Sequence, residues 1–169
     1  MKKYFFLLST AVFALLTPLY ATSVQRLSFE ELVAKAHTIV QGSVVSALTY
    51  RSADGKLILT NYTISVEESL KGASGRTVIL TTIGGRIGNT VLHVSGMPVL
   101  QPGEKAVLFL EQAGAYTTVV GLNQGKFTVY NGEISNSVTG LSFPDGGPGT
   151  PLKMPVDEFK RQVKLRLNR

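Results

Sequence analysis

Two glycine-rich segments have the residue types that could form a ligand-binding loop. The first, GGRIGN, follows a strand-like run and contains Gly84, Gly85 and Arg86. A phosphate-binding loop of this kind leads into a helix, whose first N–H groups hold the anion. The residues that follow, TVLHV, are typical of a strand instead. We therefore interpret the segment as a turn. Because loops between the strands of a small barrel are where ligands bind, these three residues are candidate contacts.

The second glycine-rich segment, GLNQGKF, has three residues between its glycines, where a phosphate loop has four. Phe127 also stands where that motif places a Ser or Thr to hold magnesium. We interpret this segment as a turn between two strands. Asn123, Gln124 and Lys126 complete the set of candidate partner-binding residues.

Catalytic signatures are missing from the rest of the chain. Neither His37 nor His93 has a carboxylate three or four residues later, and GASGR lacks the G-x-S-x-G spacing of a nucleophile elbow. We expect His37 to end the first helix and His93 to lie exposed on a strand. The sequence therefore predicts no catalytic residue, no metal site and no cofactor. A hydrolase assembled from distant residues such as His93 and Asp145 remains an alternative.

The chain contains no cysteine, which excludes thiol nucleophiles, thiolate zinc sites and disulfides. Its net charge of +6 is concentrated at the two ends. Between residues 22 and 159, ten Lys and Arg residues face eleven Asp and Glu residues. A nucleic-acid-binding domain carries its positive charge on the folded body, so we predict no nucleic-acid partner. Binding of an oligosaccharide or a nucleic acid is kept as a further alternative.

The N-terminus has the layout of a secretory signal peptide. Lys2 and Lys3 precede an apolar run, Pro18 breaks it, and Ala21 is a small residue at the expected cleavage site. The run is shorter than the roughly 20 residues that a spanning helix requires. We predict a signal peptide at 1–21 and a secreted or periplasmic mature protein without a transmembrane span. A retained N-terminal anchor is the alternative.

The remaining sequence predicts a short helix followed by many strands. Ser28 and Glu31 have the spacing of a capping box at a helix start. LTNYTISVEE then alternates with period two, as a strand with one buried face does. Asp54-Gly55 predicts a hairpin before it, and Gly42 predicts a bulge. Further short strands are expected in RTVILTTI, KAVLFLEQ, YTTVVGL and KFTVYN.

These elements predict three parts after the signal peptide. A β-barrel domain spans 22–140, a Gly/Pro-rich strap spans 141–155, and a C-terminal amphipathic helix spans 156–169. In this helix Val156, Phe159, Val163 and Leu167 recur at helical spacing, which favours packing on the barrel over attachment to a membrane surface. The expected fold is mainly β, a small antiparallel barrel that is closed or partly open.

Four segments share the outline of a known family: AHTIVQGSVVSALTY, TNYTISVEESLKG, TVILTTIGG and GEKAVLFLE. Over residues 28–130 the chain resembles the netrin-like, OB-type barrel of tissue inhibitors of metalloproteinases. Through SGMPVLQPGEKAVLFL and VVGLNQGKF it also resembles small exported bacterial domains, some of which accompany matrixin-type metalloprotease domains. The resemblance implies an OB-type barrel and a metalloprotease as a partner. The inhibitors chelate zinc through an N-terminal cysteine, which this chain lacks.

Taken together, the sequence predicts an exported, non-enzymatic β-barrel module that engages a protein or envelope partner through its loops. A metalloprotease-associated domain, inhibitory or chaperoning, is the first alternative. An unrecognised hydrolase is the second.

Overall fold

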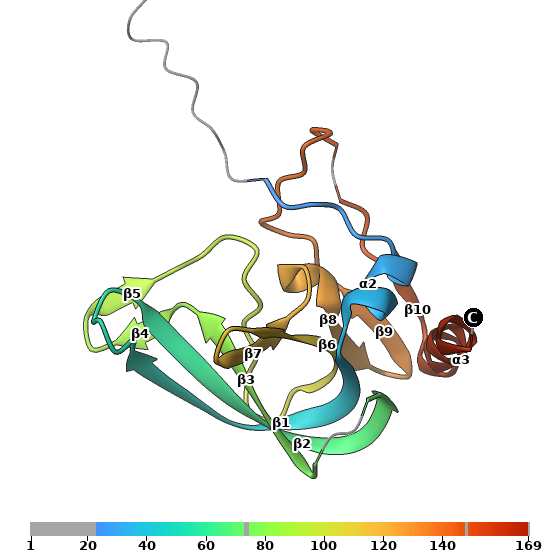
Figure 1. Ribbon diagram of the computed structural model, residues 1–169, viewed down its shortest axis with the longest axis horizontal. Coiled ribbons are helices and arrows are strands. Elements are labelled where there is room, and N and C mark those ends of the chain that lie inside the picture. The colour runs from blue at the N-terminus through green and yellow to red at the C-terminus, as the bar shows by residue number, and fades with distance from the viewer. Residues whose placement is uncertain (1–22, 73–74, 148, 169) are drawn as a thin grey trace, which may run out of the picture.

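The computed structural model describes residues 23–72, 75–147 and 149–168. The predicted signal peptide, 1–21, therefore lies outside the described residues. A strongly bent sheet forms the body, with both helices at one end and a small two-stranded hairpin at the other (Figure 1). In the described part of the chain, every helix is too short or too polar to cross a bilayer.

Helix α2 (Phe29–Lys35) begins at the predicted capping box. The Ser28 hydroxyl accepts a hydrogen bond from the Glu31 N–H, and the Glu31 carboxylate accepts one from the Ser28 N–H. Its two turns bury Leu32 and Val33. The helix ends at Lys35 with Ala36 as its C-cap, so the prediction that His37 ends it was wrong by two residues; His37 is exposed just before β1.

Eight strands form one antiparallel sheet in the order β10-β9-β8-β6-β1-β2-β3, with β7 also paired to β6, and β4 and β5 form a separate pair. The strands are β1 (Thr38–Arg51), β2 (Ile58–Lys71), β3 (Thr77–Ile83), β4 (Gly85–Ile87), β5 (Thr90–Leu92), β6 (Lys105–Ala113), β7 (Tyr116–Val119), β8 (Lys126–Tyr130), β9 (Glu133–Asn136) and β10 (Lys153–Pro155).

The β1–β2 hairpin is the longest feature of the sheet, with fourteen residues in each strand. Its register shifts at Gln41–Gly42, so the predicted bulge is confirmed. A side chain on Gly42 would collide with the backbone of Ser65. The predicted turn at Asp54-Gly55 is also present, with Gly55 at φ 71°. The expectation of uniformly short strands was wrong, because bulges let these two strands bend and continue past both cores.

Strand β6 separates two hydrophobic cores, because its successive side chains point to opposite faces. Val107 and Phe109 belong to the core beneath the two helices. Ala106, Leu108 and Leu110 belong to the core inside the bent part of the sheet. All five are at most 1% exposed, so β6, like β1 and β2, contributes buried side chains to both cores.

Four phenylalanine rings fill the core beneath the helices. Their six pairwise centroid distances run from 4.8 to 6.3 Å, and most pairs meet edge to face. Such geometry is favourable for aromatic rings. The rings come from α2, β6, β8 and the C-terminal helix, namely Phe29, Phe109, Phe127 and Phe159.

The predicted mainly β, antiparallel fold is confirmed, but the sheet does not close into a barrel. Strand β3 is an edge of the sheet, and β7 pairs only with β6. The two strands lie against each other, yet no ladder pairing joins them among the described residues. Each pairing along β3-β2-β1-β6-β7 is antiparallel, so β3 and β7 run in the same direction. The contact between these two strands is an unpaired seam.

The last part of the chain follows the prediction with one correction. The predicted strap at 141–155 is irregular at first, but its last three residues form β10 on β9. Helix α3 (Val156–Leu167) is present and buries Phe159 and Val163 completely. Leu167 is 36% exposed, so only part of the predicted apolar stripe contacts the body.

Candidate functional site

An apolar groove lies between the β1–β2 and β6–β7 hairpins. Its cavity volume is about 700 Å³. The tip of the β1–β2 hairpin forms one wall and the β6–β7 hairpin the other, with the end of β3 between them. Met97 and Leu122 complete the lining. The groove therefore spans the seam where β3 meets β7 without pairing.

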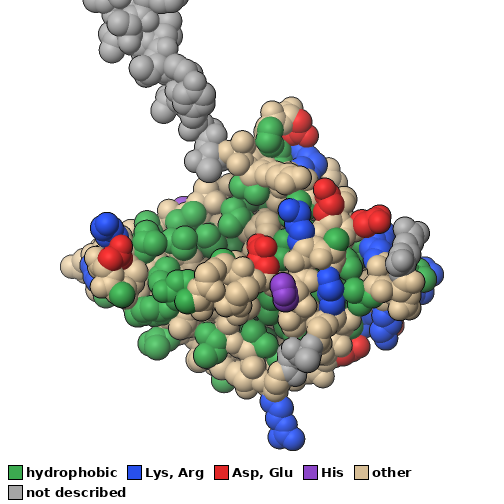
Figure 2. Space-filling model, viewed as in Figure 1, with side chains coloured by type: hydrophobic (Ala, Val, Ile, Leu, Met, Phe, Trp, Pro, Cys, Tyr) green, Lys and Arg blue, Asp and Glu red, His purple; other side chains and the backbone are tan. Residues whose placement is uncertain are grey.

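Large apolar side chains form the exposed rim of the groove. Leu57, Ile83 and Tyr116 are 41%, 36% and 44% exposed. Leu57 and Tyr116 come from the two walls, and Ile83 comes from the end of β3 between them. Figure 2 shows hydrophobic side chains gathered over this half of the molecule, whereas charged side chains concentrate over the half that carries α3. An exposed apolar surface of this kind is typical of a site that binds a partner or ligand.

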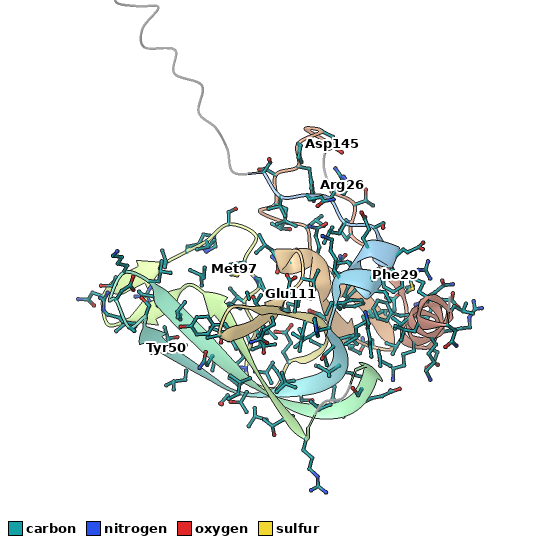
Figure 3. The ribbon with its side chains drawn as sticks, viewed as in Figure 1. Arg26, Phe29, Tyr50, Met97, Glu111 and Asp145 are labelled. Atoms are coloured by element: carbon teal, nitrogen blue, oxygen red, sulfur yellow. The ribbon has the colours of Figure 1, made fainter. Side chains whose placement is uncertain are left out.

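Among the described residues, two carboxylates, of Asp54 and Glu111, and no cation line the groove. The Asp54 carboxylate accepts a 2.6 Å hydrogen bond from the Ser52 hydroxyl, which is the main reason that the pKa of Asp54 lies below its ordinary value of 3.8. Lys56 lies 4.0 Å from the same carboxylate. Glu111 is half-buried, and among the described residues its carboxylate has neither a hydrogen bond nor an ion pair. Figure 3 shows Glu111 and Met97 in the central part of the molecule.

The first set of predicted site residues comprises Gly84, Gly85 and Arg86, and the two glycines have a structural role. The Gly84 N–H donates a 2.8 Å hydrogen bond to the Ile58 carbonyl, and the Gly84 carbonyl accepts one from the Thr60 hydroxyl. Gly85 has φ 135°, and a Cβ there would lie 2.6 Å from Thr49 and Thr60 side-chain atoms. These glycines let β4 pack on the β1–β2 hairpin. Arg86 is exposed on β4, outside the residues that line the groove.

The predicted turn at GGRIGN is a β-hairpin, β4–β5, with Arg86 paired to Val91. The expectation of β structure after it is confirmed. His93 directly follows β5 and is exposed, as predicted, but it does not belong to a strand.

The second set of predicted site residues comprises Asn123, Gln124 and Lys126. They lie in the 3-10 helix η1 (Leu122–Gly125) and at the start of β8. The prediction of a simple turn was therefore incomplete. The Asn123 N–H donates to the Gly96 carbonyl at 2.9 Å. The Lys126 ammonium donates to the Val99 carbonyl and forms a 2.8 Å ion pair with Glu104. These contacts hold neighbouring loops together, and none of the three side chains of the set lines the groove.

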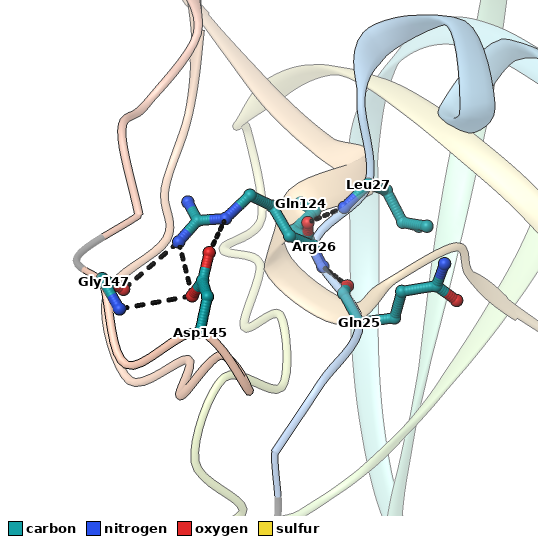
Figure 4. Close-up of polar contacts among 6 residues, drawn as sticks. All are labelled: Gln25, Arg26, Leu27, Gln124, Asp145 and Gly147. Carbon is teal, nitrogen blue, oxygen red and sulfur yellow. Dashed lines mark hydrogen bonds and ion pairs between the residues drawn. The ribbon is translucent and has the colours of Figure 1, made fainter.

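The Gln124 side chain holds the N-terminal segment through hydrogen bonds, which together are called the polar clamp here. It is 3% exposed. Its Oε1 accepts a hydrogen bond from the Leu27 N–H, and its Nε2 donates to the carbonyls of Gln25 and Gly121. Figure 4 shows the clamp beside the strap. A buried amide whose groups are all paired in this way has a structural role.

Replacing Gln124 by leucine is expected to lower the free energy of unfolding by about 1–3 kcal/mol, because the Leu27 N–H would lose its partner. Equilibrium unfolding in urea measures this change, and hydrogen exchange at Leu27 should become faster. Gln112→Leu is the matched control, since Gln112 is exposed and should change stability by no more than about 0.5 kcal/mol. Unchanged exchange at Leu27 in the Gln124 variant would contradict the assigned role.

An ion pair connects the N-terminal segment to the strap. The Arg26 guanidinium lies 3.1 Å from the Asp145 carboxylate and stacks on the Phe143 ring at 4.1 Å. Hydrogen bonds from Arg26, and then from the Gly147 N–H, lower the pKa of Asp145 below 3.8. A carboxyl whose pKa falls on folding contributes stability above its ordinary pKa and loses that contribution as the pH falls through the lowered value. The contact therefore persists at neutral pH.

The two residues suggested for a hydrolase have different surroundings. The Asp145 carboxylate accepts hydrogen bonds from the Arg26 guanidinium and from the Gly147 N–H. His93 lines a small cavity of about 60 Å³ together with Tyr62 and Gly85, and Asp145 is not part of that cavity. In the part of the chain that the structure describes, no three His, Asp or Glu residues are placed to hold a metal ion.

The candidate groove was missed by the sequence analysis. Its residues come from positions 52–59, 81–83, 97 and 111–122, and no local motif connects them. A weak signal was available in Leu57 and Tyr116, two large apolar residues beside turns. Comparisons with protein-family models, with curated proteins and with solved structures found no match.

Proposed function

We propose that the protein is an exported, non-enzymatic module that binds a segment of another protein in the groove between the β1–β2 and β6–β7 hairpins. The observation that carries this proposal is the apolar cavity of about 700 Å³, open to solvent, with large apolar side chains at its rim. Its volume is within the range of roughly 300–1,000 Å³ that ligand pockets occupy.

The chemistry of the groove favours a protein segment over other occupants. Apolar side chains dominate the walls, so burial of a partner's apolar side chains supplies the binding free energy. In the part of the chain that the structure describes, the lining contains carboxylates and no cation. This disfavours a nucleic acid or an anionic lipid headgroup, because their phosphates would be repelled. Apolar partner side chains therefore fit this surface, whereas phosphate groups do not.

An OB-type arrangement is part of the proposal. The strand order β3-β2-β1-β6-β7, with β7 beside β3, supports it. In OB-type barrels, the loops after the first and fourth strands flank the ligand site, and the β1–β2 and β6–β7 loops occupy these positions here. A metalloprotease is one partner class suggested by the family resemblance, and identification of the bound partner would test it.

Affinity capture with matched surface variants tests the proposal. Leu57→Asp and Tyr116→Asp place a charge at the groove rim, whereas Leu165→Asp does so on α3, where the side chain is 50% exposed. All three positions are exposed enough that folding should survive, which circular dichroism and thermal unfolding would verify. A partner captured by the wild-type protein should be lost by both groove variants, with an affinity decrease of about tenfold or more.

The Leu165→Asp variant should retain the same partner. Equal capture by the groove variants and the wild-type protein would reject the groove as the binding site. Loss with Leu165→Asp alone would place the site at α3 instead.

A further inference from the structure

We infer that Glu111 selects partners that carry an arginine or lysine beside their apolar contact residues. The inference rests on the proposed function and adds the chemistry of the partner segment. It starts from one residue, Glu111, which lines the apolar groove and whose carboxylate has neither a hydrogen bond nor an ion pair in the described part of the chain.

The position of Glu111 is set by the β6–β7 ladder. It pairs with Thr118 across the ladder, and both residues line the groove. Phe109 and Leu110, the residues just before it on β6, are at most 1% exposed. Glu111 therefore lies where the buried part of β6 ends and the groove begins.

The other charged group of the groove does not compensate Glu111. Asp54 carries the same sign of charge and already has Ser52 and Lys56 as neighbours. When an apolar segment covers the groove and displaces water, the Glu111 carboxylate loses hydration. A cation on that segment offsets this loss, whereas a neutral or acidic group does not. Arginine fits best, because its guanidinium can bind a carboxylate through two hydrogen bonds.

Charge complementarity thus defines the occupant as an extended segment with apolar side chains and one basic residue. The apolar groups occupy the rim formed by Leu57, Ile83 and Tyr116, and the basic group reaches Glu111. Selection of peptides from a randomised library tests this directly. Such a library offers basic, neutral and acidic segments to the groove equally, so any preference for basic segments comes from the protein.

The probe is a displayed library of random peptides, selected against the whole exported chain. The wild-type protein should enrich peptides with apolar residues and an adjacent arginine or lysine. Replacement of that arginine by citrulline, its neutral isostere, should weaken an enriched peptide by about tenfold, as expected for a partly desolvated charge pair. Glu111→Gln should bind the arginine and citrulline peptides equally.

Reversal of the charge at residue 111 is the second part of the peptide-selection experiment. Glu111→Arg should enrich acidic instead of basic peptides from the same library. Glu133→Gln is the control, since Glu133 is exposed on β9 and pairs with Lys153, and its peptide preference should match that of the wild type. A basic preference that persists in Glu111→Gln, or the absence of any enriched peptide, would overturn the inference.

The two proposals fail in different ways. If the Leu57→Asp and Tyr116→Asp variants lose the captured partner but no preference for basic peptides depends on Glu111, only the inference about Glu111 is wrong. If those variants keep the partner, the groove is not the site and both proposals are wrong.

Discussion

Replacing Phe127 by alanine is expected to lower the free energy of unfolding by about 3–5 kcal/mol. The side chain is completely buried and meets the rings of Phe109 and Phe159 at centroid distances of 5.3 and 4.8 Å. Truncation removes the buried apolar area and leaves a cavity lined by the other rings, which β6 and the helices hold in place. Equilibrium unfolding in guanidinium chloride, followed by circular dichroism, measures the loss.

Two variants show whether the loss comes from the ring cluster. Phe127→Leu retains most of the buried volume and should cost clearly less than the alanine variant. Tyr130→Ala, at a residue of the same strand that is 75% exposed, should change stability by no more than about 0.5 kcal/mol. A Phe127→Ala loss below about 1 kcal/mol would contradict the packing described here.

The second large effect is expected at the glycine that joins β4 to the hairpin. Gly85→Ala should destabilise the protein by roughly 3 kcal/mol, from a backbone conformation that L-residues avoid and from a clash. Gly85 has φ 135°, and an added Cβ would lie 2.6 Å from side-chain atoms of Thr49 and Thr60. Thermal and denaturant unfolding measure the loss of stability.

A matched control separates the cost of the steric clash from the cost of placing an L-residue at positive φ. Gly88 also has positive φ, at 57°, but nothing lies within 4 Å of an added Cβ. Gly88→Ala should therefore cost only about 1 kcal/mol. The double variant Gly85→Ala with Thr49→Ala should recover part of the loss, because Thr49 supplies a clashing methyl group. Equal losses at Gly85 and Gly88 would show that close packing of β4 contributes nothing.

Local sequence patterns predicted most of the fold. The capping box at Ser28, the turn at Asp54-Gly55 and the bulge at Gly42 are all present, because each depends on residues close in the chain. The small strands β4, β9 and β10 were not assigned as strands. They are three or four residues long, too short to display a period, and they exist because of the partners that they pair with.

The candidate site could not be predicted in the same way. A pair of glycines such as Gly84 and Gly85 is found both in ligand-binding loops and where two strands pack closely. The sequence does not distinguish these two roles, whereas the position of Thr60 beside both glycines in the structure does. Gln124 resembles a surface loop residue in the sequence, yet the N-terminal segment folds over it. The groove itself spans the seam where β3 and β7 lie against each other without pairing, and this arrangement depends on the topology of the whole sheet.

Methyl NMR of the protein bound to its captured partner tests the central claim most directly. With labelled Ile, Leu and Met side chains, the signals of Leu57, Ile83 and Met97 should shift or broaden on binding, while that of Leu165 on α3 should not change. This result would place the partner in the groove between the two hairpins. Unchanged groove signals together with a shifted Leu165 signal would contradict the account.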